Sequence, residues 1–122
     1  MKILHVNVAE PVTDMLARAG AVMEALDAGD APSPYYGIGF DSFPEMLSVF
    51  SAERWRLLNT LSANGPSSLS ELAARLGREE SAVKQDLDLL VDWNVVEPQV
   101  DGRLAVPWDE VELHLPLAQR AA

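Results

Sequence analysis

The stretch LAARLGREESAVKQDLDLLVDWNVV, from Leu72 to Val96, decides the fold of this chain. Its apolar residues recur as they do on two short amphipathic helices, with small residues where the helices must cross and turn. These positions are Leu72, Ala73, Leu76, Gly77, Val83, Leu87, Leu90 and Val96. Ala73 allows close crossing and Gly77 allows a sharp turn. We therefore predict a helix-turn-helix, with helices over 68–76 and 79–93.

The residues around this motif add a helix before it and a hairpin after it. Ser51 is suited to cap a helix that Asn64-Gly65-Pro66 then closes. After the motif, residues 95–96 are expected to begin a strand, Asp101-Gly102 is a two-residue hairpin signal, and residues 104–106 return. A hairpin at this place would form a wing beside the two helices.

Three more stretches alternate apolar and polar residues, as half-buried strands do. They are residues 2–8, 36–42 and 111–115. Between the first two, residues 13–28 read as an amphipathic helix that stops at Gly29, and Pro44 opens a short helix. Because the small motif cannot cover three apolar strand faces, we expect these strands to pair with one another. The predicted α+β organisation is a strand-helix-strand extension, a winged helix-turn-helix, and a C-terminal strand and tail, over 1–43, 44–106 and 107–122.

Composition excludes several classes of protein. The chain has 122 residues, no cysteine and a net charge of −10, so it has no disulfide and no thiolate metal site. It contains no apolar run of about 20 residues and its first residues do not resemble a signal peptide. We therefore expect a soluble, cytoplasmic protein that does not bind membranes. The absence of a phosphate loop, a nucleophile motif or an acid-base pair predicts that it is not an enzyme and needs no cofactor.

The two histidines are interpreted as surface residues. His5 and His114 fall on the polar sides of their strands, where they can face each other across a sheet. The acidic residues Asp109, Glu110 and Glu112 are interpreted as a solvated edge rather than a divalent metal site, on the expectation that no histidine or second cluster lies near them. We accordingly predict no metal site.

From residue 51 to 106 the chain resembles the winged helix-turn-helix of the MarR and ArsR type regulators. Two flanking runs, FDSFPEMLSVFSAERWRLLNTL (40–61) and GRLAVPWDEVELHL (102–115), resemble a small family of predicted transcriptional regulators. Some members of that family are encoded beside toxins as antitoxins. The resemblance implies sequence-specific binding of double-stranded DNA with autorepression, and for some members a cognate toxin as partner.

One face of the second motif helix carries the candidate DNA contacts. At about 100° per residue, Val83, Leu87 and Leu90 form the buried stripe, so the residues opposite them face the groove. Lysine donates to guanine and glutamine pairs with adenine, while serine and arginine also reach phosphates. The candidate DNA-binding residues are Arg75, Arg78, Ser81, Lys84, Gln85 and Arg103. Arg103 follows the wing turn, where a basic residue can enter a minor groove.

The acidic balance supports an alternative function. Glu79 and Glu80 stand where the helix would enter the groove, and Glu79 occupies a cap position that Asp or Ser fills better. The chain would then be an acidic winged-helix interaction module that binds a basic partner without direct DNA contact.

For DNA binding we expect a homodimer that uses helix 13–28 and the three strands, because two-fold symmetry matches a palindromic operator.

Overall fold

The computed structural model describes residues 1–9, 12–29 and 35–117, and the chain divides into two compact units. The helical unit consists of residues 1–2 and 47–109. The sheet unit consists of residues 3–46 and the chain from Glu110 onward. The architecture is mixed α+β, as expected, and the C-terminal strand belongs to the same unit as the N-terminal strands.

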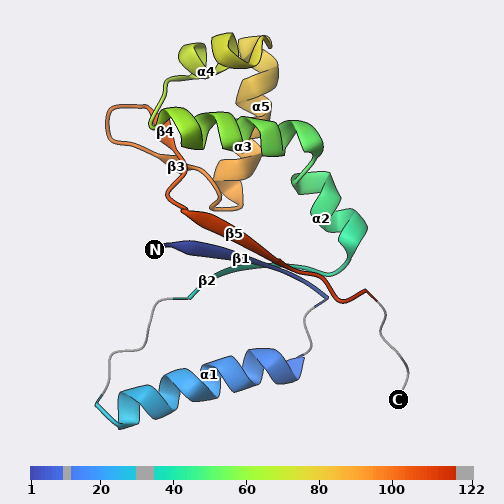
Figure 1. Ribbon diagram of the computed structural model, residues 1–122, viewed down its shortest axis with the longest axis vertical. Coiled ribbons are helices and arrows are strands. Elements are labelled where there is room, and N and C mark those ends of the chain that lie inside the picture. Colours follow the sequence, from blue (N-terminus) through green and yellow to red (C-terminus); the bar gives the residue numbers. More distant parts are fainter. Residues whose placement is uncertain (10–11, 30–34, 118–122) are drawn as a thin grey trace. The chain divides into compact units, whose positions relative to one another are not determined.

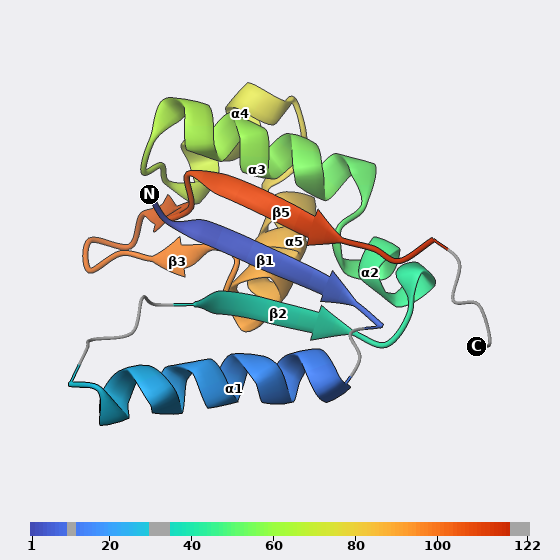
Figure 2. The same ribbon diagram turned by 60° about the horizontal axis from the view of Figure 1, so that its bottom comes forward.

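The sheet unit is built on a three-stranded parallel sheet of order β2-β1-β5. The strands are β1 (Ile3–Val8), β2 (Tyr36–Phe40) and β5 (Glu110–His114). Figure 2 shows β1 between the other two, with all three arrows running the same way. Helix α1 (Val12–Asp27) connects β1 to β2, and a parallel pair needs a long crossover of this kind. The expectation that the three strands pair is confirmed.

The central strand has two chemically different faces. Leu4, Val6 and Val8 are buried, as the alternating pattern predicts. His5 and Asn7 point to the opposite face, and the Asn7 amide donates to the Tyr35 hydroxyl at 2.9 Å. One face of β1 therefore contributes apolar packing, and the other carries ring and amide groups able to bind polar ligands.

The helical unit contains three helices followed by a short hairpin (Figure 1). These elements are α3 (Ala52–Asn64), α4 (Leu69–Leu76), α5 (Glu80–Asp92), β3 (Glu97–Pro98) and β4 (Leu104–Ala105), and α2 (Phe43–Val49) precedes them. The fully buried side chains of the helical unit include Leu57, Leu61, Leu72, Val83 and Leu90, which come from all three helices.

Among the described residues, no helix combines the length and the apolar character that crossing a bilayer requires.

The helix boundaries follow from local capping chemistry. The Ser51 hydroxyl accepts from the Arg54 amide at 3.3 Å and begins α3. Gly77 ends α4 with a φ of 64°, a left-handed conformation that glycine adopts without a Cβ clash. Asn94 directly follows Trp93, the C-cap residue of α5, and has a φ of 62°. Asparagine tolerates this left-handed conformation better than most residues. Glu79 is the α5 N-cap and makes no side-chain cap hydrogen bond, as the sequence indicated.

The hairpin differs from the prediction in its start and its loop. Val95 and Val96 are not in a strand, because the backbone amides of both donate to the Leu90 carbonyl at the end of α5. The loop is also longer than two residues. The Gln99 amide donates to the Arg103 carbonyl at 2.7 Å, and the Gly102 amide donates back to the Gln99 carbonyl at 3.0 Å. Three residues therefore cross the turn, and Gly102 takes the positive φ of 84° that such loops require.

The second strand of the hairpin also pairs with the chain before α4. Ser67 and Leu104 exchange two backbone hydrogen bonds, of 3.0 and 2.8 Å. Because Ser67 directly precedes the α4 cap, this bridge fixes the hairpin beside the start of α4.

Replacing Ser68 with alanine should destabilise the helical unit by about 1 kcal/mol, because Ser68 and Glu71 form a reciprocal capping box at the start of α4. Urea unfolding followed by circular dichroism measures this change. Ser70→Ala is the matched control, because Ser70 is exposed in the same turn and makes no part of the box. An equal effect of the two substitutions would contradict the role of the capping box.

Candidate functional site

A buried acidic residue lies on the inner face of α5. Asp86 is buried although it is charged, and it stands between the core residues Val83 and Leu90. Its two carboxylate oxygens are both paired: Arg54 Nε donates to Oδ1 at 3.1 Å and Arg78 Nη1 donates to Oδ2 at 2.8 Å. A buried carboxylate is stable in such a place only when both oxygens find partners. We call these three residues the Asp86 cluster.

The Asp86 cluster links several elements of the helical unit. Arg54 on α3 also donates to the carbonyl oxygens of Ser48 and Val49 at the end of α2, at 2.6 and 3.2 Å. Arg78, in the turn before α5, also pairs with Glu53 at 3.5 Å. The Asp86 carboxylate, held from two sides, therefore helps to fix the rotation of α5 about its axis, together with the buried apolar stripe of that helix.

The opposite face of α5 is exposed. Ser81, Lys84, Gln85 and Asp88 all face solvent, as their helical spacing predicted. Lys84 Nζ pairs with Asp88 at 2.8 Å, one turn along the helix, with the Lys84 side chain 63% exposed. An exposed pair of this kind contributes little stability, so an incoming anion can exchange with the aspartate at small cost.

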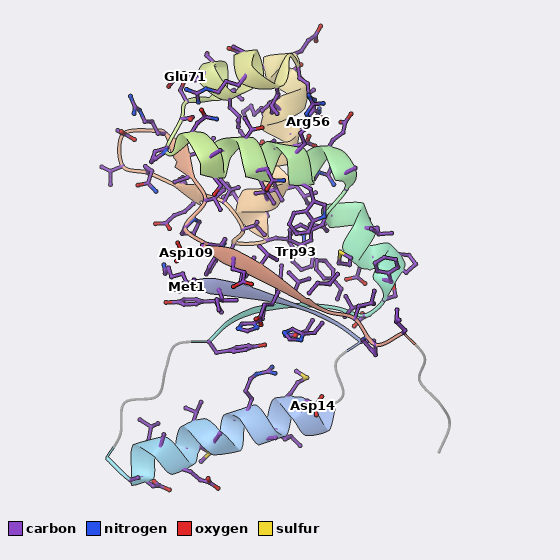
Figure 3. All side chains as sticks on the ribbon, viewed as in Figure 1. Met1, Asp14, Arg56, Glu71, Trp93 and Asp109 are labelled. Atoms are coloured by element: carbon purple, nitrogen blue, oxygen red, sulfur yellow. The ribbon has the colours of Figure 1, made fainter. Side chains whose placement is uncertain are left out.

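Two more of the expected DNA contacts, Arg75 in the last turn of α4 and Arg103 in the hairpin, have their charged groups near the first turn of α4. Arg75 Nη1 donates to the Ser67 hydroxyl at 2.8 Å, and Arg103 Nε lies 3.7 Å from Asp101. Hydrogen bonds from Ser68 lower the pKa of Glu71, and the positive charges of Arg103 and Arg75 lower it further. Both arginines are therefore close to Glu71, the residue that Figure 3 labels in the first turn of α4.

Arg78 is placed differently from the other candidates. Its side chain is 24% exposed, and its guanidinium is held by Asp86 and Glu53. The structure thus brings Ser81, Lys84 and Gln85 onto one open face and places Arg78 within the internal ion pairs. The sequence reasoning did not identify Asp86, although a charged residue three positions after Val83 and four before Leu90 was the available signal.

A second group of polar side chains lies in the sheet unit. His5 on β1 faces His114 and Glu112 on β5. His5 Nδ1 lies 3.3 Å from His114 Nε2 and 3.2 Å from Glu112 Oε2, and His114 Nε2 lies 3.6 Å from the same carboxylate oxygen. The histidines do face each other across the sheet. Glu112 lies beside both of them, so the expectation that no histidine is near the acidic stretch is wrong. Asp109 is not part of this group, because its carboxylate accepts from the Lys2 amide at 2.7 Å.

Replacing Asp86 with asparagine should destabilise the helical unit by about 2–4 kcal/mol, because both arginines would lose a buried counter-charge. Asp88→Asn is the control on the outer face of the same helix, with an expected loss of no more than about 0.5 kcal/mol. Urea denaturation measures both. If Asp86→Asn proved as mild as Asp88→Asn, the cluster would not determine the orientation of α5.

Comparison with known proteins gives a family assignment. No curated protein matches this chain, and no protein of solved structure matches it. The family described as HVO_A0114 matches residues 49–113, which include α3, α4, α5, the hairpin and most of β5. Because this match covers more than half of the 122 residues, the chain belongs to the HVO_A0114 family.

Proposed function

We propose that this protein is a sequence-specific transcriptional regulator that binds double-stranded DNA, acting as an autorepressor of its own gene. One observation carries the proposal: α5 buries Asp86 with its apolar stripe and leaves Ser81, Lys84 and Gln85 together on an open face. These residues stand in the first half of a helix that follows a short turn, which is how recognition helices present base-reading side chains.

The order of elements supports a winged helix-turn-helix. Helices α4 and α5 are separated by three residues, 77–79, and Gly77 makes the turn. The hairpin β3–β4 follows α5 and is held to the chain before α4 by the Ser67–Leu104 bridge. We interpret this hairpin as the wing, as in the MarR and ArsR type regulators that the sequence resembles.

Each candidate residue has a distinct role in this proposal. Lys84 releases Asp88 and donates to guanine O6 or N7, and Gln85 pairs with an adenine edge. Ser81 contacts a phosphate or a base near the start of the helix. Arg75 and Arg103 contact phosphates, because their charged groups lie near the first turn of α4 and remain partly exposed. Arg78 contributes by holding Asp86.

The combined Lys84→Ala and Gln85→Ala variant should lose at least about 1–3 kcal/mol of affinity for a duplex from upstream of the protein's own gene, since base contacts have this magnitude. Fluorescence anisotropy measures the affinity. Arg56→Ala is the control, because it removes a positive charge from the exposed surface of α3 (Figure 3). The Arg56→Ala variant should lose less affinity than the double variant. Binding to a scrambled duplex should change little in either of the two variants.

Salt dependence provides a check on the same proposal. The helical unit carries ten acidic and seven basic residues, a net charge of −3, so its DNA contacts must be few and local. A dimer should give a log–log salt slope of about −3 to −5. Equal losses in the double variant and in Arg56→Ala, or no binding at low salt, would contradict recognition by α5.

A second function is favoured by a specific observation. Lys84 and Arg103 are each paired with a neighbouring acid, and Glu79 and Glu80 are exposed at the start of α5. This surface would suit a basic protein, such as a cognate toxin, bound without DNA contact. Binding of such a partner with strong salt dependence, combined with absence of DNA binding, would favour this alternative.

The exposed surface of α1 supports a homodimer. Large apolar side chains are exposed along its length, and soluble monomers seldom leave so many uncovered. They are Met15, Leu16, Val22, Met23 and Leu26. A second copy of the chain is the occupant that we propose, because two-fold pairing matches the two half-sites of a palindromic operator.

Replacing Leu16 and Met23 with glutamate should convert the protein from dimer to monomer without unfolding it, because both side chains are exposed on α1. Light scattering gives the mass, and circular dichroism tests the fold. Ala17→Glu with Glu24→Gln is a control that leaves the large apolar side chains in place. A monomeric wild-type protein, or a dimer that survives the double substitution, would contradict this assignment.

A further inference from the structure

We propose that His5, Glu112 and His114 form a binding site for Zn²⁺ in the sheet unit. Their nearest nitrogen and oxygen atoms converge, with all three ligand atoms within 4.8 Å of one another. The register explains why. His5 on β1 lies opposite Glu112 on β5, and His114 is two residues further along β5, so its side chain returns to the same face.

The spacing of the three atoms fits a tetrahedral ion. The separations are 3.3 Å between the two imidazole nitrogens, and 3.2 and 3.6 Å from these nitrogens to Glu112 Oε2. Bonds of about 2.0–2.2 Å in tetrahedral geometry hold ligand atoms about 3.3–3.6 Å apart. Octahedral Mg²⁺, with bonds of about 2.0–2.1 Å, would require about 2.9 Å instead. The group therefore has the dimensions of one triangular face of a zinc site.

The ligand types point to the same class of metal. Imidazole nitrogens with one carboxylate suit Zn²⁺, whereas Ca²⁺ and Mg²⁺ prefer oxygen ligands alone. Without a cation, the facing nitrogens His5 Nδ1 and His114 Nε2 need a proton between them, and which ring donates it depends on the tautomer. A bound cation instead accepts the lone pairs of all three atoms.

Neighbouring residues hold the His5 ring in place. The Tyr35 ring stacks on it with centroids 4.6 Å apart and an interplanar angle of 15°. Tyr35 is itself fixed by the Asn7 amide, which donates to its hydroxyl, and by Arg18, which lies 4.3 Å from its ring centroid. Such outer contacts position metal ligands in known sites.

The site is open on one side. The His5 side chain is 22% exposed and the His114 side chain is 55% exposed, so an ion can enter from solvent. Three protein ligands leave one tetrahedral position for water or an external group. Because the ligands come from strands at opposite ends of the described chain, bound Zn²⁺ would also tie β1 to β5.

Titration of the tag-free protein with Zn²⁺ tests the proposal. The chain has two histidines, so both sets of imidazole signals in the proton NMR spectrum belong to this site. We expect one Zn²⁺ per chain, movement of both sets of signals, and a higher melting temperature. Calorimetry should show that His114→Ala and Glu112→Gln each weaken binding at least about tenfold, the minimum typical even of outer-shell changes.

Glu110→Gln is the matched control, since Glu110 is exposed on the same strand and lies outside the group of converging ligands. It should bind Zn²⁺ like the wild-type protein. The proposal would be overturned by unchanged histidine signals, or by variants at His114 and Glu112 that bind as tightly as Glu110→Gln. Circular dichroism shows whether each variant is folded, and the Glu112→Gln substitution keeps the test valid if the His114 variant is not. None of these readouts depends on DNA binding.

Discussion

The buried carboxylate of Asp86 is the constraint on which the helical unit depends. A carboxylate in a core needs compensation at both oxygens, and Arg54 and Arg78 provide it from α3 and from the turn before α5. Two directional ion pairs add an angular constraint to the apolar packing of α5. The consequence is a fixed outer face that carries Lys84 and Gln85. Internal electrostatics thereby define the surface that we propose reads DNA.

The sheet unit is organised by a different constraint, the parallel register of β1 with its two neighbours. This unit carries nine acidic residues against Arg18 and Arg120, a net charge of −7, so it would repel nucleic acid. Its polar features are better suited to cations and to protein contacts. The His5, Glu112 and His114 group and the exposed face of α1 provide these two kinds of surface.

The sequence predicted local features and the pairing of the three strands, but it did not give the register of that pairing. Period-2 alternation located all three strands of the sheet, and Ser51 and Gly77 marked helix ends, because these signals depend on nearby residues. The hairpin loop was one residue longer than its Asp101-Gly102 signal indicated, since Gln99 and Arg103 close it. The meeting of His5 with Glu112 could not be derived, because alternation gives the face of each strand and not its register with a distant partner.

Backbone amide NMR of the isotopically labelled protein, titrated with a duplex from upstream of its own gene, tests the central claim most directly. The account predicts that the largest chemical-shift changes fall on residues 80–88 of α5, with further changes at the hairpin loop 99–103 and near Arg75. Residues of the parallel sheet should change little. Changes confined to the sheet strands, or no changes at a DNA excess in low salt, would contradict recognition of DNA by the outer face of α5.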